Sequence, residues 1–218
     1  MFNRRIGFIL VIALAAGLGL LAAQKYFGAA SPSGPQWPET RSITMFPQAR
    51  ALPAFSLRQS DGTQLASGEL NGHWTLVFLG FTYCPDVCPT TLAELAQAQN
   101  QWKSLPDSTR PRVLFVSVDP ERDTPTRIGE YAHAFHADTL AATADVPALE
   151  NFARSLMFVF QKMPGKDFDR NPEDYTMDHS ANIAVLDPQG RMVGFIKPPF
   201  QPRAIADDMA ALTKASMQ

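Results

Sequence analysis

Cysteine is scarce in this chain: its 218 residues include only two, four positions apart. That number excludes a small fold held together by a framework of disulfides. Basic residues are not in excess either, because the formal net charge is −2, and a broad positive field for nucleic acid is excluded. With 45% hydrophobic and 18% charged residues, disorder along the whole chain is excluded as well. Two cysteines this close together are better suited to chemistry than to holding up a fold.

Charge is missing from residues 6–23, an 18-residue run that follows Arg4 and Arg5 and precedes Lys25. As a helix this run would be about 27 Å long, close to the hydrocarbon thickness of a bilayer. The arginines predict a single N-terminal transmembrane anchor with residues 1–5 in the cytoplasm. The C-terminal domain then lies outside the cytoplasm, on the periplasmic side of the inner membrane in a bacterium. A cleaved signal peptide ending near Ala22 and Ala23 is the alternative. No cysteine follows the run, which excludes a lipid-modified cysteine anchor.

The composition changes after the anchor. Serine, proline and glycine at positions 31–35 are unfavourable for a helix and for a core. We therefore expect three parts: residues 1–25 as a membrane anchor or signal segment, residues 26–50 as a Pro/Ser-rich linker, and residues 51–218 as one globular domain.

Within that domain, the pattern predicts strands that alternate with helices. Asp61 and Gly62 favour a turn between short strands at 55–57 and 63–65. Thr124 and Pro125 are typical of a helix start, and Pro89 suits the first turn of another helix. We further expect strands at 74–81, 113–118 and 157–160, helices at 89–103, 146–156 and 202–214, and a hairpin of 183–186 and 192–196. This order indicates a layered α/β domain that ends in a β-hairpin and a helix.

The two cysteines lie in the segment FTYCPDVCPT, between a predicted buried strand and a predicted helix. Ligands bind at the carboxyl ends of strands in open α/β sheets, and a helix N-terminus favours the thiolate form of cysteine. A spacing of four places both sulfurs on one side of a helical turn, where they share a soft metal or form a disulfide. The alternatives are two buried cysteines that act as small hydrophobes, or a disulfide that only stabilises, although so short a loop gains little from one.

A third ligand would have to be a histidine. Two thiolates suit copper(I) or zinc. Of the four histidines, His133 and His136 are three apart on what we interpret as the solvated face of a helix, and His73 is interpreted as a turn residue. His179 precedes a predicted buried strand. From spacing alone, a structural role for His179 is the more usual one.

A family resemblance favours a ligand role for His179 over a structural one. The motifs FTYCPDVCP, VSVDPERDTP and DYTMDHSANIAVLDPQGR occur in this order, and together they resemble the Sco/SenC family over residues 50–215. The resemblance implies a thioredoxin-like fold with an extra β-hairpin and one copper ion, as copper(I), on Cys84, Cys88 and His179. It also implies delivery of copper to the CuA centre of cytochrome c oxidase subunit II or to another exported acceptor. An upstream copper donor or a thiol reductase is a further implied partner.

Several nearby residues have an open role. Asp178 either orients His179 or is a solvated loop acid, and Asp86 either tunes the thiols and faces the partner or is solvated. Met163 and Met177 are interpreted as core or surface residues, with a thioether ligand as the alternative. The motif VSVDPERDTP contributes Asp119, Asp123 and Thr124, which we interpret as loop and cap residues and not as metal ligands.

Three functions compete. The first is a copper delivery protein without turnover. The second is a thiol-disulfide oxidoreductase that reduces the cysteines of the acceptor, and the third is a peroxide-reducing enzyme, which the CPDVC spacing resembles less well. His179 discriminates between the first two, because an oxidoreductase needs only Cys84 and Cys88 whereas a copper donor needs all three side chains.

Overall fold

The computed structural model describes residues 4–27 and 37–217, and it divides into two compact units, residues 1–36 and 37–218. In the first unit, α1 (Arg4–Phe27) is a single helix with exposed apolar side chains. Its segment Ile6–Lys25 has a mean hydropathy of 2.6 and is not buried, so it is long and apolar enough to cross a membrane. It is therefore a candidate membrane anchor, although a signal sequence near an N-terminus meets the same criteria.

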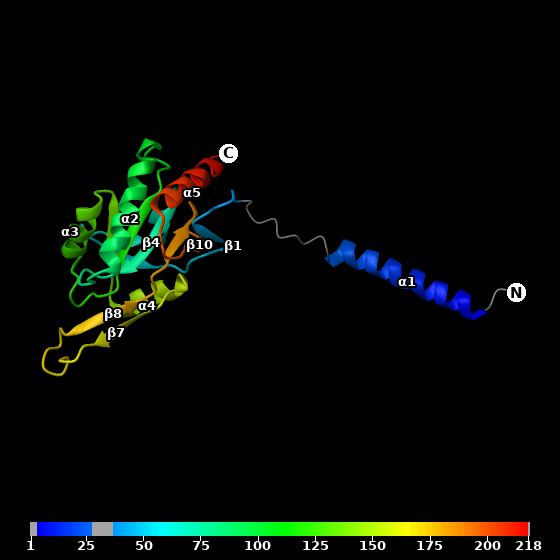
Figure 1. The fold of residues 1–218 in the computed structure, drawn as a ribbon, viewed down its shortest axis with the longest axis horizontal. Helices are drawn as coiled ribbons and strands as arrows, with labels where there is room; N and C mark the ends of the chain where they lie inside the picture. The colour runs from blue at the N-terminus through cyan, green and yellow to red at the C-terminus, as the bar shows by residue number, and fades with distance from the viewer. Residues whose placement is uncertain (1–3, 28–36, 218) are drawn as a thin grey trace. The chain divides into compact units, whose positions relative to one another are not determined.

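An eight-stranded mixed sheet forms the centre of the second unit (Figure 1). Its middle strands are parallel to one another: β4 (Thr75–Gly80), β5 (Arg112–Ser117) and β6 (Thr139–Thr143). β4 is buried along its whole length, as expected of a parallel strand covered on both faces. The order across the sheet is β1-β10-β9-β4-β5-β6-β2-β3.

Antiparallel strands complete the sheet on both sides. β9 (Ile183–Leu186) pairs with β4 and forms a hairpin with β10 (Met192–Ile196). On the other side, β2 (Ser56–Gln59) pairs with β6 and forms a hairpin with β3 (Gln64–Ala66). Both predicted hairpins are confirmed.

Four helices cover the sheet: α2 (Val87–Gln101), α3 (Pro125–Phe135), α4 (Val146–Ser155) and α5 (Pro202–Ala215), with short 3₁₀ turns at Ser67–Leu70 and Trp102–Ser104. α2 and α5 pack side by side (Figure 1). The predicted cap of α3 is confirmed, because the Thr124 hydroxyl accepts a hydrogen bond from the Arg127 N–H and Pro125 is the first helical residue. The predicted layered α/β architecture is confirmed with them.

A separate two-stranded sheet consists of β7 (Phe160–Pro164) and β8 (Tyr175–His179), which are antiparallel. The predicted strand at 157–160 is wrong in its bounds, because Met157 has a φ of 58°, a left-handed conformation that ends α4 and delays the strand. Neither β6 nor β8 was predicted from the sequence. In β8, Tyr175 and Met177 are buried whereas Thr176 and Asp178 are exposed, which is the alternation of a strand with one covered face.

The predicted linker is too long. Residues 28–36 lie outside the described residues, but β1 (Ile43–Arg50) belongs to the large sheet, where Ile43 pairs with Ile196 of β10. The domain begins earlier still, because the Trp37 ring packs edge-on against Trp74 with centroids 5.2 Å apart. β1 lies at the sheet edge with one neighbouring strand, so it tolerates a proline and polar residues and does not have the apolar run of a central strand.

This boundary gives a first prediction. A protein beginning at residue 37 should be soluble and unfold cooperatively, whereas one beginning at residue 51 should lose β1 and leave β10 as an uncovered edge. Burial of Ile43 stabilises the domain by roughly 1.5–3 kcal/mol, the range for fully burying a large apolar side chain, and the half-buried Trp37 adds to this. Urea denaturation of the two proteins measures the difference. Equal free energies of unfolding would show that β1 is dispensable.

Candidate metal centre

Both cysteines lie where β4 ends, as the sequence predicts. Residues 81–86 connect β4 to α2, with Cys84 in this loop and Cys88 as the second residue of the helix. Both cysteines are free thiols. The Cys88 N–H donates a hydrogen bond to Cys84 Sγ over 3.4 Å, so this sulfur takes the place that a side-chain oxygen usually has at a helix N-terminus.

Cys88 is fully buried and lies directly against Gly80. A Cβ at position 80 would stand 2.9 Å from Cys88 Sγ, so only glycine leaves room for the sulfur. Burial raises the pKa of the Cys88 thiol well above its usual range, and the neighbouring Cys84 raises it further. The expectation of a thiolate at this helix N-terminus is therefore wrong for Cys88, because burial disfavours the charged form of the thiol. A metal that binds Cys88 has to displace a proton.

His179 reaches this position through the pairing of β9 with β4. The chain leaves β8 at His179 and enters β9 at Ile183, whose partner is Phe78, two residues before β4 ends. Because β9 runs antiparallel to β4, its first residue lies at the carboxyl end of β4, beside the cysteine loop. His179 Nε2 consequently stands 3.6 Å from Cys88 Sγ, although the two residues are 91 positions apart.

The His179 ring is oriented for coordination. Its Nδ1 lies 3.1 Å from the Ser180 carbonyl oxygen, which only accepts, so Nδ1 carries the proton and donates it. Nε2 therefore presents its lone pair to Cys88, where it accepts from the thiol in the metal-free protein. The rings of Phe78 and Phe81 stand edge-on to the imidazole at 6.0 and 6.1 Å, and burial lowers the pKa of His179. A neutral imidazole with one nitrogen held by a carbonyl is the form that binds metals.

The three predicted ligands are neighbours without forming a closed cage. Within the described parts of the chain, no three Cys, His, Asp or Glu side chains already stand at metal-binding spacing. A metal–thiolate bond is about 2.3 Å long and a metal–imidazole bond about 2.0–2.1 Å for a zinc-sized ion, so the 3.6 Å between Cys88 Sγ and His179 Nε2 suits one ion bound to both atoms.

Asp123 holds the cysteine loop in place through hydrogen bonds to its carboxylate. Its buried carboxylate accepts hydrogen bonds from the Thr82 N–H at 2.9 Å, the Thr82 hydroxyl at 2.6 Å and the Ser117 hydroxyl at 2.6 Å. The sequence interpretation of Asp123 as an ordinary loop residue missed this role. The motif VSVDPERDTP alone did not show that its aspartate bonds to a segment 41 positions earlier.

Replacing Asp123 by asparagine should destabilise the protein by roughly 1.5–3 kcal/mol, the contribution of one hydrogen bond to a charged group. An amide nitrogen cannot accept from the three donors that converge there. Asp61 is a matched control, because its exposed carboxylate accepts from the Thr63 N–H and hydroxyl at the same distances. Urea denaturation should show a large loss for Asp123→Asn and a much smaller one for Asp61→Asn. Similar losses in both would contradict a special role for Asp123.

The two predicted acidic neighbours are exposed. Asp86 precedes the first residue of α2, and its side chain does not cap the helix. Asp178 alternates with His179 along β8, so its side chain leaves the strand on the other face. Among the described residues no hydrogen bond joins Asp178 to His179, and the Ser180 carbonyl orients the ring instead. Roles for Asp86 and Asp178 stay predictions.

Among the described residues, no hydrogen bond or ring contact joins the remaining candidates to the cysteines. His73 bonds to the Arg110 carbonyl, and His133 is exposed on α3. His136 is buried, which contradicts the predicted solvated face, because α3 ends at Phe135. Met177 is buried in the core and Met163 is exposed on β7, in agreement with the core and surface interpretation.

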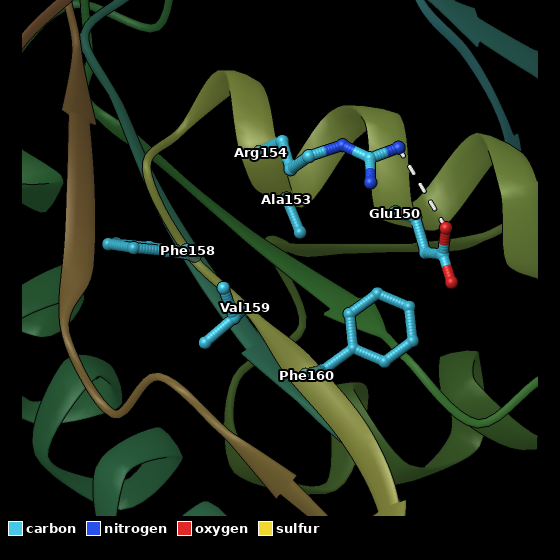
Figure 2. A pocket seen from close by; sticks show the side chains of 6 residues that line it. All are labelled: Glu150, Ala153, Arg154, Phe158, Val159 and Phe160. Atoms are coloured by element: carbon cyan, nitrogen blue, oxygen red, sulfur yellow. Dashed lines mark ion pairs between the residues drawn. The ribbon is translucent and has the colours of Figure 1, made fainter.

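One shallow pocket is lined by the histidine, and a second lies next to the first. One has a volume of about 240 Å³ and is lined by residues 159–161 and 178–180, including His179 itself. The other has a volume of about 200 Å³ and shares Val159 and Phe160 with the first; Figure 2 shows these two side chains opposite Arg154 and Glu150, which form an ion pair. Val159 is 70% exposed. His179 therefore lines an accessible pocket that combines apolar and polar side chains.

A layered α/β domain with two thiols and one imidazole at the carboxyl edge of its sheet is typical of the thioredoxin-like class, with a candidate metal site. Known structures agree with this class. Bradyrhizobium japonicum ScoI with copper bound is 33% identical, with a TM-score of 0.66, and the match covers 74% of this chain and 99% of that one. BsSco, described as a member of the Sco family of cytochrome c oxidase assembly proteins, is 18% identical with a TM-score of 0.57 over 81% of this chain and 98% of that one, and shares the fold. The predicted thioredoxin-like fold is confirmed.

The SCO1/SenC family model matches residues 44–214, and the chain belongs to this family. The Bos taurus protein SCO2 homolog, mitochondrial, is 34% identical over 182 residues, which are 84% of this chain and 66% of that protein. The chain thus matches just under two thirds of the length of this relative.

Proposed function

We propose that the chain binds one copper(I) ion through Cys84, Cys88 and His179 and delivers it to a copper centre of cytochrome c oxidase. The observation that carries the proposal is the approach of His179 Nε2 to Cys88 Sγ at 3.6 Å, with Nδ1 held by a backbone carbonyl. Two thiolates and one imidazole are the soft and borderline donors that copper(I) prefers. The finer assignment, delivery to the CuA centre of subunit II, rests on the family's implied partner.

The accessibility of the ligands supports transfer. Cys84 is half-buried and the pocket beside His179 is open, whereas Cys88 is covered. A ligand from an acceptor can therefore reach the ion on the exposed side before the buried sulfur releases it. With only three protein ligands, the ion accepts an incoming ligand without first losing one.

Relatives support the same function. Copper is bound in the Bradyrhizobium japonicum protein, and BsSco belongs to a family of oxidase assembly proteins. The apolar helix α1 supports a membrane-anchored protein with its domain outside the cytoplasm, on the side where positively charged residues are disfavoured. That location gives access to an exported copper acceptor.

Anaerobic titration of the reduced protein with copper(I) tests the proposal. In competition with a copper(I) chelator, binding should saturate at one ion per chain. Saturation at two ions, or no competition with the chelator, would contradict the site. The matched control is the Cys84→Ser, Cys88→Ser protein, which should not compete.

Thiol–disulfide exchange is the second candidate, and the unequal burial of the two sulfurs favours it. The accessible Cys84 would attack an acceptor disulfide and release one acceptor thiol, and Cys88 would then attack Cys84 and release the other. Two electrons pass to the acceptor, and Cys84 and Cys88 end as a disulfide. The peroxide-reducing alternative has no such support, because the nearby Thr82 hydroxyl is committed to Asp123.

A further inference from the structure

The segment between Asp119 and Asp123 touches both halves of the metal centre. On one side, Asp123 holds Thr82 of the cysteine loop through two hydrogen bonds. On the other side, Asp119 Oδ1 accepts a hydrogen bond from the Tyr175 hydroxyl at 2.7 Å. Tyr175 is the first residue of β8, the strand that ends at His179. The segment therefore joins two parts of the chain that contribute different ligands.

Arg122 makes most of this connection. Its Nε donates to Asp119 at 2.6 Å, its Nη1 donates to the Tyr175 carbonyl at 3.0 Å, and its Cζ lies 3.6 Å from the centre of the Tyr175 ring. The same guanidinium lies 4.7 Å from the ring of Tyr83, the residue before Cys84. The side chain is only 9% exposed. One buried cation thus contacts the cysteine loop and the base of the histidine strand.

The β7–β8 sheet needs such a contact. It has two strands and no ladder of hydrogen bonds to the eight-stranded sheet. An isolated two-stranded hairpin is marginally stable in water, so side-chain contacts have to fix its position. A metal site tolerates errors of only about 0.5 Å in the placement of its ligands. Movement of β8 at Tyr175 would be transmitted along the strand to His179.

We propose that Arg122 is a positioning residue that fixes His179 relative to Cys84 and Cys88 by clamping Tyr175 and Tyr83. The proposal rests on the proposed copper function. Arginine suits the task because its planar fork reaches a carboxylate and a carbonyl at once while its face stacks on an aromatic ring. Lysine keeps the charge and loses the fork, so Arg122→Lys removes the clamp without leaving the buried Asp119 unpaired in charge.

Arg127 provides the matched control. Its guanidinium also lies over the Tyr83 ring, at 4.4 Å, and its Nε donates to the Thr82 hydroxyl at 2.9 Å. It therefore contacts the cysteine loop as Arg122 does. In the described part of the chain, no hydrogen bond, ion pair or ring contact joins Arg127 to β8, so Arg127→Lys should leave His179 in place.

The test is a double-mutant cycle on the full chain in detergent, with copper(I) affinity measured by competition with a chelator. Arg122→Lys should weaken binding about tenfold when His179 is present, which is within the range for residues that orient metal ligands. In the His179→Ala background, the same substitution should change affinity less than about twofold, because no imidazole is left to position. Arg127→Lys should change it less than about twofold in both backgrounds. An equal loss from Arg122→Lys in both backgrounds, or no loss in either, would overturn the clamp.

Two further measurements keep the test decisive. If Arg122→Lys does not fold, Tyr175→Phe removes only the hydroxyl bond to Asp119 and should show the same dependence on His179. In the metal-free protein, amide hydrogen exchange at 175–179 should accelerate in Arg122→Lys while exchange in β4 stays unchanged; unchanged exchange at 175–179 would contradict the clamp. Loss of affinity from His179→Ala with identical effects of Arg122→Lys in both backgrounds would leave the copper site standing and remove the clamp alone.

Discussion

Replacing His179 by alanine should weaken copper(I) binding by more than about 100-fold. Loss of a residue that merely orients a ligand costs about 10–100-fold, and loss of the ligand itself should cost more. The remaining two thiols keep their place, because Gly80 and the helix N-terminus hold Cys88 without help from the imidazole. Competition with a copper(I) chelator measures the change. His133→Ala, on the exposed face of α3, is the matched control and should bind as the unmodified protein does.

The same variant separates copper delivery from thiol reduction in cells. A delivery role predicts that His179→Ala fails in oxidase assembly at low copper as Cys84→Ser does. His179→Ala could also alter thiol exchange, because an imidazole 3.6 Å from the Cys88 thiol can accept its proton during that reaction. The reaction of Cys84 with a small disulfide should therefore be measured in parallel and should change little. Normal assembly in His179→Ala together with failure in Cys84→Ser would favour the reductase.

Oxidation of the two cysteines should abolish copper(I) binding. A disulfide between Cys84 and Cys88 removes both sulfur ligands at once and leaves a single imidazole. We expect the affinity to fall by more than about 1,000-fold, since two ligands are lost and each exceeds the 10–100-fold effect of an outer partner. The oxidised protein should not compete with a copper(I) chelator, and reduction should restore one ion per chain. Comparable binding by both forms would contradict a site built on the two thiols.

The sequence motifs singled out Cys88 and His179, which the structure brings together, but they missed much of what surrounds them. The motif around Cys84 and Cys88 identified a strand–helix junction because apolar runs and helix-start residues are local signals. That His179 joins them depends on the antiparallel pairing of β9 with β4, a contact between distant segments that periodicity does not encode. The family resemblance supplied it. The resemblance did not supply the orientation of the ring, which the Ser180 carbonyl fixes; orienting the ring was only one of the two roles left open for Asp178.

Two predictions from the sequence, a linker at β1 and a thiolate at Cys88, are wrong for physical reasons. β1 was interpreted as linker because an edge strand pairs with one neighbour and lacks the continuous apolar run of a central strand. The thiolate expected at Cys88 followed from the helix dipole, but the depth of burial was not readable from the sequence, and burial disfavours the charged form of the thiol. The buried partners of Asp119 and Asp123 were missed for the same reason, since they come from Tyr175 and Thr82, far away in the chain.

X-ray absorption at the copper edge, on reduced protein loaded with one equivalent of copper(I), tests the central claim most directly. We predict two sulfur neighbours and one nitrogen neighbour for the unmodified protein, and loss of the nitrogen in His179→Ala with both sulfurs retained. A spectrum of the unmodified protein with sulfur neighbours only, or one that His179→Ala leaves unchanged, would contradict the three-ligand centre of Cys84, Cys88 and His179.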